Sequence, residues 1–192
     1  TIQSGEPPAG FEYGTEYTRE QIDEALASDN PLQIVPSTDT IGHGTAIASV
    51  AAGSRLSGNR RFIGAAPDCN IVVVKLKPIK QYLREYYLIP EDVPCYQETD
   101  LIQAIQYLQK FAVSLYSPLV ICLGVGTNLG DHSGVSVFAR YLDLVMGRKS
   151  RAAVTCSGNE GNAAHHYHGE LTRQQPSQNV EIRVGGEMGG FV

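Results

Sequence analysis

The chain has 192 residues, of which 42% are hydrophobic and 18% are charged, and its formal net charge at pH 7 is −5. This composition is typical of a globular protein that can bury one core. Because there is no excess of basic residues and no long apolar stretch, we expect no nucleic-acid partner and no membrane partner. The four cysteines are scattered without a C-x-x-C pair, so we also expect no metal and no cofactor.

Residues 1–40 are predicted to be an irregular N-terminal segment that contains one short helix. Thr18 and Gln21 have the spacing of a capping box, which predicts that a helix begins there and continues to about residue 27. Pro31 and the residues before it are expected to end this helix. A connecting loop should then lead to residue 40.

Residues 41–53 are the most informative stretch of the chain. His43 opens a run of small and apolar residues, which predicts a helix that is buried in a tight interior. At the start of that helix, the dipole would favour the neutral imidazole ring that a general base requires. A core histidine with a satisfied hydrogen bond is an equally good interpretation of this histidine taken alone.

The middle of the chain alternates between strand patterns and helix patterns. This alternation predicts an α/β fold with a mainly parallel sheet and helices on both faces. The predicted strands are residues 71–76, 119–123 and 152–156, and the predicted helices are residues 99–113 and 135–146.

Two segments fall outside this alternation. Residues 53–61 are predicted to be a polar turn that carries three arginines. Residues 77–98 are rich in tyrosine and contain three prolines, and they are long for a connection within a domain. Connections of that length are usually functional or disordered.

Glycine-rich segments follow two of the predicted strands. Gly124-Val125-Gly126 comes after the strand at residues 119–123, and Ser157-Gly158-Asn159 comes after the last strand. Since ligands gather beyond the carboxyl ends of parallel strands, we expect the two segments to lie close together at a site. Considered singly, each segment is more simply a turn or the end of a strand.

Four short motifs follow one another along the chain. They are His43-Gly44-Thr45, Gly64-Ala65-Ala66-Pro67 with the strand after it, Leu123-Gly124, and Gly158-Asn159-Glu160-Gly161. In this order they resemble the motifs of subtilisin-like serine peptidases. The resemblance covers residues 41–162 and implies the core of a catalytic domain, with part of the subtilisin-like three-layer fold.

The resemblance implies a function and a set of site residues. It implies that His43 is the general base and that Asn159 donates a hydrogen bond to the oxyanion of the tetrahedral intermediate. A protein or peptide substrate is then expected to pair with the backbone of the segment after the strand. The residues of that segment are Leu123, Gly124, Val125 and Gly126.

A narrower resemblance concerns the clostridial Csp-type branch of this family. Residues 14–20 and the tyrosine-rich insertion are similar to that branch, whose members act in spore germination and carry a jelly-roll insertion. This implies that residues 163–192 are a loop and the first strand of such an insertion, with the strand at residues 179–192. An extracytoplasmic or spore-associated location would follow.

The chain departs from the family pattern in its catalytic aspartate and serine. None of Asp23, Asp29 and Asp39 fits the aspartate, because the first two belong to a helix or its end and Asp39 is too close to His43. No Gly-Thr-Ser motif follows Asn159. We therefore expect an internal fragment of a larger peptidase, inactive by itself, completed by other segments of that protein and prone to self-association.

Other interpretations remain open. Ala46 stands where a second histidine is common in the family, so a catalytically inactive pseudopeptidase that binds a partner is the main alternative. A non-catalytic α/β binding module would explain the sheet but would leave the four motifs as coincidence. A metal at His165, His166 and His168 is disfavoured, because acidic or cysteine partners at ligand spacing are absent.

Overall fold

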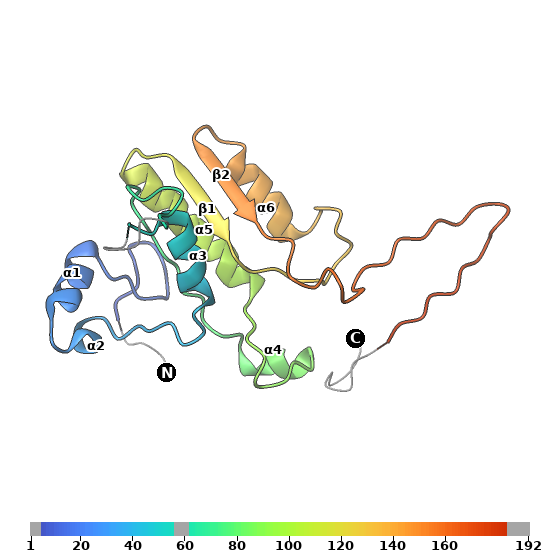
Figure 1. Ribbon diagram of the computed structural model, residues 1–192, viewed down its shortest axis with the longest axis horizontal. Coiled ribbons are helices and arrows are strands. Elements are labelled where there is room, and N and C mark those ends of the chain that lie inside the picture. Colours follow the sequence, from blue (N-terminus) through green and yellow to red (C-terminus); the bar gives the residue numbers. More distant parts are fainter. Residues whose placement is uncertain (1–4, 56–61, 184–192) are drawn as a thin grey trace. The chain divides into compact units, whose positions relative to one another are not determined.

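The computed structural model describes residues 5–55 and 62–183, which belong to two units, Thr1–Cys69 and Asn70–Val192 (Figure 1). The described part of the first unit contains three helices, and the described part of the second contains three helices and two strands. The first unit has α1 (Arg19–Ala27), α2 (Pro31–Ile34) and α3 (His43–Ala52), and the second has α4 (Gln81–Tyr86), α5 (Glu98–Ser114), β1 (Leu119–Leu123), α6 (Val137–Met146) and β2 (Arg151–Thr155).

Helix α1 begins at the capping box that the sequence predicts. The backbone amide of Thr18 donates to Oε1 of Gln21 at 2.9 Å, and the amide of Gln21 donates to Oγ1 of Thr18 at 3.4 Å. Ala25 of α1 is buried, and α1 contacts α2. The loop expected after Pro31 instead begins with α2, because the fixed φ of a proline suits the first position of a helix.

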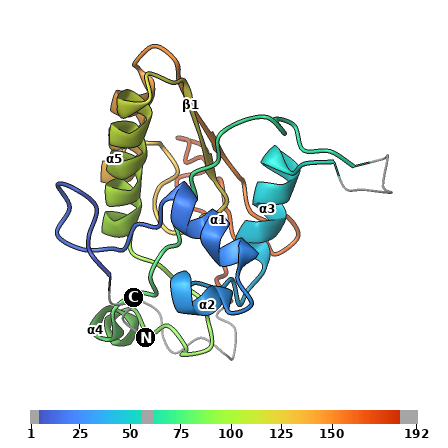
Figure 2. The ribbon, with the colours of Figure 1, turned by 90° about the vertical axis from the view of Figure 1, so that its left-hand side faces the viewer.

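The second unit is organised around a parallel pair of strands. Leu119 of β1 lies opposite Arg151 of β2, and Leu123 lies opposite Thr155. The core is formed by Ile105 of α5, Ile121 of β1 and Val145 of α6, which are at most 4% exposed. Figure 2 shows α5 alongside β1. The α/β class and the parallel pairing that the sequence predicts are both confirmed.

In this unit α5 and α6 contact each other and pack on the face of the sheet that carries Ile121. Side chains alternate between the two faces of a strand, so the neighbours of Ile121 point to the opposite face. There Val120 is 69% exposed and Val154 is 57% exposed. The second unit therefore presents an apolar sheet face to solvent.

The prediction of a strand at residues 71–76 is wrong. All six residues are described, and the sheet of the described part consists of β1 and β2. Val73 is 72% exposed. A strand requires a ladder of hydrogen bonds with a neighbour, whereas the Val/Ile pattern reports only the hydrophobicity of the segment.

Residues 77–98, the long connection that precedes α5, contain the short helix α4. The two ends of this connection are joined by the amide of Ile79, which donates to the carbonyl oxygen of Cys95 at 3.0 Å. Within it, the guanidinium of Arg84 donates to the carbonyl oxygens of Pro90 and Val93. The hydrogen bond between its ends and the bonds within it show a structured connection with a helix of its own.

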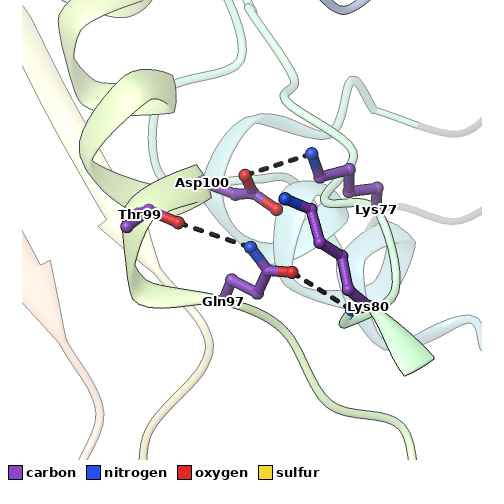
Figure 3. A network of polar contacts seen from close by, with 5 residues as sticks. All are labelled: Lys77, Lys80, Gln97, Thr99 and Asp100. Carbon is purple, nitrogen blue, oxygen red and sulfur yellow. Dashed lines mark hydrogen bonds and ion pairs between the residues drawn. The ribbon is translucent and has the colours of Figure 1, made fainter. Parts of the chain in front are cut away.

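A network of polar contacts connects this segment with the first turn of α5 (Figure 3). The amide of Lys80 donates to Oε1 of Gln97 at 3.1 Å, and Nε2 of Gln97 donates to Oγ1 of Thr99 at 3.4 Å. Nζ of Lys77 lies 3.4 Å from Oδ1 of Asp100, whose side chain is 7% exposed. The carboxylate of Asp100 lies in the first turn of α5, where a negative charge also interacts favourably with the helix dipole.

Two predicted segments extend past the described residues. Residues 56–61 of the expected polar turn lie outside them. Residues 179–183 form no strand, and residues 184–192 lie outside the described part, so the strand at 179–192 stays a prediction. None of the described helices is long and apolar enough to cross a membrane.

Candidate functional site

His43 is the first residue of α3, where the sequence places it, and its side chain is exposed. The exposure argues against the alternative of a buried core histidine. Gly42 precedes it as the N-cap with φ = 83°, a left-handed conformation that glycine adopts without steric cost. The imidazole therefore projects from the first turn of a helix at the surface of its unit.

The expected burial of α3 is wrong for the unit to which it belongs. Ala52 is the buried residue of this helix, whereas Val50 is 64% exposed. The small side chains of α3 would allow another element to pack closely on the helix. They do not determine whether such an element covers it. The composition of the helix thus predicted its capacity for close packing and not its exposure.

The Gly64-Ala65-Ala66-Pro67 motif has a structural role at the other end of α3. The amides of Ala65 and Ala66 donate to the carbonyl oxygens of Val50 and Ala51 at 3.1 and 2.9 Å. These carbonyls belong to the last turn of the helix, which has no intrahelical donors for them. A Cβ on Gly64 would lie 2.4 Å from the nitrogen of Gly53, so this approach requires glycine.

Asp39 is a residue of this region that sequence reasoning considered only as the catalytic aspartate. Its carboxylate accepts hydrogen bonds from the amides of Ile41, Gly42 and Thr45 at 3.0, 2.7 and 3.2 Å, and from the hydroxyl of Thr45 at 2.6 Å. The Thr45 hydroxyl, followed by these amides, holds the pKa of Asp39 well below its usual range. An aspartate shortly before a helix start is a signal for such capping.

The two glycine-rich segments leave the sheet side by side, as expected. Residues 124–126 follow β1 and residues 156–159 follow β2, and the last residues of these strands, Leu123 and Thr155, are partners in the ladder. Farther along, Nδ2 of Asn128 lies 2.9 Å from Nδ1 of His165. The rings of His132 and His166 stack with centroids 5.6 Å apart.

Asn159 lies in an exposed turn. Gly158 before it has φ = 80°, and the backbone amide of Asn159 donates to Oε2 of Glu160 at 3.0 Å. The turn continues with the amide of Ala163, which donates to the carbonyl oxygen of Glu160 at 2.8 Å. The turn interpretation is therefore correct for the backbone, and it is compatible with a side-chain amide that is available to a ligand.

These residues offer two chemical capabilities. An exposed imidazole can transfer protons, and an exposed carboxamide can donate a hydrogen bond to a developing negative charge. Asn159 and residues 123–126 lie at one edge of the sheet in the second unit, and His43 belongs to the first unit. Within residues 5–55 and 62–183, no three His, Cys, Asp or Glu side chains converge as they would to hold a metal ion.

Comparisons with known proteins include an informative similarity to a solved structure. No protein-family model matches the chain, and no curated protein sequence matches it. Among solved structures, the Clostridium perfringens CspB protease matches with a TM-score of 0.63 and 31% sequence identity. The match covers 78% of this chain and 30% of that protein, so the chain spans less than a third of its length. The chain is thus an α/β protein that is similar in structure to part of a subtilisin-like protease.

Proposed function

We propose that this chain forms part of the catalytic domain of a subtilisin-like serine endopeptidase. The observation that carries the proposal is the similarity to the CspB protease, at 31% identity over 78% of the chain. The exposed position of His43 at the start of α3 supports it. So does the shared edge of the sheet, where residues 124–126 and Asn159 follow paired strands.

In this proposal His43 and Asn159 act at successive points of one acyl-transfer reaction. His43 takes the proton from a serine hydroxyl as that oxygen attacks the peptide carbonyl, and it later returns the proton to the leaving amine. Asn159 donates its side-chain amide to the oxyanion of the tetrahedral intermediate. Loss of one such donor lowers turnover by about 10²–10³-fold, so Asn159 is expected to contribute strongly without being indispensable.

The proposed substrate is an extended segment of a protein or peptide. In the described part of the chain, β1 has one ladder partner, β2, and residues 124–126 continue past the end of β1. A peptide that runs beside Leu123, Gly124, Val125 and Gly126 would bond to their backbone by strand addition. This mode of binding gives affinity through the main chain and little selectivity for side chains.

The proposed nucleophile and catalytic aspartate come from other segments of the same protein. Asp39 is engaged with the backbone around His43 and with Thr45, and no Gly-Thr-Ser motif occurs in the chain. The 192-residue chain alone is therefore proposed to be inactive. Its exposed apolar sheet face around Val120 and Val154 would favour association with those segments or with further copies of the chain.

A pseudopeptidase is the second candidate function. The specific observation in its favour is Ala46, which lies on α3 one turn beyond His43 at a position where a second histidine is common in the family. In this case the same edge of the sheet would bind a protein partner without cleaving it. Regulation of spore germination is one such role for a protein with this resemblance.

Hydrolysis of a peptide library by the full-length protein distinguishes the two candidates. If the proposal is correct, the wild type cleaves peptides, His43→Ala abolishes turnover, and Asn159→Ala lowers kcat by about 10²–10³-fold. His168→Ala serves as a matched control, because His168 is exposed and outside the proposed site, and it should leave kcat unchanged. Peptide binding without cleavage by the wild type would favour the pseudopeptidase.

A further inference from the structure

We propose that Asp39 is a positioning residue for His43: its carboxylate closes residues 39–45 into a loop that fixes the direction of the imidazole. This inference rests on the proposed role of His43 as general base. It assigns to Asp39 a function that differs from that of the catalytic aspartate, because Asp39 acts through the backbone on either side of the histidine.

Helix α3 lacks a capping side chain of its own. The N-cap position is Gly42, which has no side chain to accept hydrogen bonds from the amides of the first turn. Those amides have no partners within the helix. Asp39, three residues before the N-cap, supplies the missing acceptor to the amide of Thr45 at 3.2 Å. The cap of this helix is therefore delivered from outside it.

The two oxygens of Asp39 accept hydrogen bonds from residues before and after His43 in the chain. Oδ1 accepts from the amides of Ile41 and Gly42, which precede the histidine. Oδ2 accepts from the amide and the hydroxyl of Thr45, which follows it. One carboxylate thus holds the chain immediately before and immediately after the proposed catalytic residue.

The glycines beside His43 explain why hydrogen bonds are needed to restrict the backbone at this point. Glycine stands on both sides of the histidine, and a Cβ added at Gly42 or Gly44 would meet nothing within 4 Å. Glycine has more backbone freedom than any other residue, so two glycines would allow the imidazole to sample many directions. The four hydrogen bonds of the Asp39 carboxylate oppose that freedom, and they hold the first turn of α3 in one conformation.

Positioning of this kind affects turnover more than binding. A general base must lie within hydrogen-bond reach of the proton that it accepts, and a displacement of about 1 Å can cost about 10²-fold in rate. Substrate affinity depends on other residues, at the end of β1. Loss of the loop closure is therefore expected to lower kcat and to leave KM nearly unchanged.

Three substitutions in the full-length protein test the inference. Asp39→Asn keeps the shape of the side chain but places an NH₂ group against the amide donors, and we expect kcat to fall by about 10–100-fold. Thr45→Val removes only the hydroxyl donor to Oδ2, and we expect a smaller loss of about 10-fold. Thr45→Ser retains the hydroxyl, and its kcat should stay within about 2-fold of the wild type.

Asp23→Asn is the matched control. Asp23 is an exposed aspartate on α1 in the same unit, and its carboxylate lies 3.9 Å from Nε of Arg19, across one helical turn. This variant should retain wild-type kcat and KM. The inference is overturned if Asp39→Asn and Thr45→Val retain wild-type kcat while His43→Ala is inactive, or if Thr45→Ser is as impaired as Thr45→Val.

A second measurement separates this inference from the proposed peptidase activity. In wild-type protein, the amide of Thr45 should exchange its hydrogen slowly, and the ring signals of His43 should form one sharp set in an NMR spectrum. In Asp39→Asn, exchange at Thr45 should accelerate by about 10-fold or more, and the His43 signals should broaden or shift. If the wild type cleaves no peptide, these changes still support the loop closure, and their absence refutes it.

Discussion

The carboxylate of Asp39 makes the loop around His43 sensitive to strong acid only. Four donors stabilise its charged form, so its pKa in the folded protein lies below the ordinary value of about 3.9. A group whose pKa is lowered by folding stabilises the folded state fully above its unfolded pKa. That stabilisation is lost as the pH falls toward the lower pKa of the folded protein.

Denaturation at several pH values checks this expectation. We expect Asp39→Asn to be less stable than the wild type at pH 7 and at pH 5 by the same amount. Below about pH 4 the difference should shrink, because the unfolded wild type then binds a proton that the folded wild type excludes. A difference that stays constant from pH 7 to pH 2.5 would contradict the assigned hydrogen bonds.

At the scale of elements, α6 is held at its first turn by two side chains. Oγ of Ser136 accepts from the amide of Ala139 at 3.1 Å, and Oε1 of Glu98 on α5 accepts from the amide of Phe138 at 3.0 Å. The first bond is a local N-cap, and the second joins two helices that pack on the same core. Both satisfy amides that the helix itself leaves without partners.

Ser136→Ala is therefore expected to lower the free energy of unfolding by about 1 kcal/mol. Glu98→Ala should also lower the free energy of unfolding, but by less, since the side chain of Glu98 is exposed. Urea denaturation measures both changes, with Ser177→Ala in an exposed loop as the control that should match the wild type. Equal stability of Ser136→Ala and Ser177→Ala would show that the cap contributes nothing.

The elements that the sequence predicted well are those with a local signal and a neighbour to pack against. Helix α5 and strand β1 begin and end within one residue of their predictions, and Ile105 and Ile121 face each other in the core. Residues 71–76 have the same hydrophobic pattern as β1 but have no ladder in the structure. Pairing is a property of two segments, so one segment's composition cannot predict it.

In the candidate site too, some residues could be predicted from local sequence patterns, and others depend on how the backbone folds. The position of His43 at a helix start and the shared edge of residues 124–126 and Asn159 followed from patterns along the chain. The role of Asp39 did not, because it depends on a backbone that folds back over three residues with Gly42 in a left-handed conformation. Nor did the role of Gly64, which depends on close approach to the end of α3.

At the scale of the whole molecule, the chain corresponds to 30% of the CspB protease that it resembles in structure. The proposed general base and oxyanion donor lie in this part, and the motifs of the other two catalytic groups do not occur in it. The proposal thus makes activity a property of the larger protein. Peptidase chemistry would then require a serine from another segment of that protein.

Labelling of the full-length protein with a fluorophosphonate probe tests this central claim most directly. The probe reacts with a serine that an adjacent histidine activates. We predict stoichiometric labelling of one serine outside residues 1–192, located by mass spectrometry, and loss of labelling in His43→Ala. The claim would be contradicted if the wild type is not labelled, if labelling survives in His43→Ala, or if the labelled serine lies within this chain.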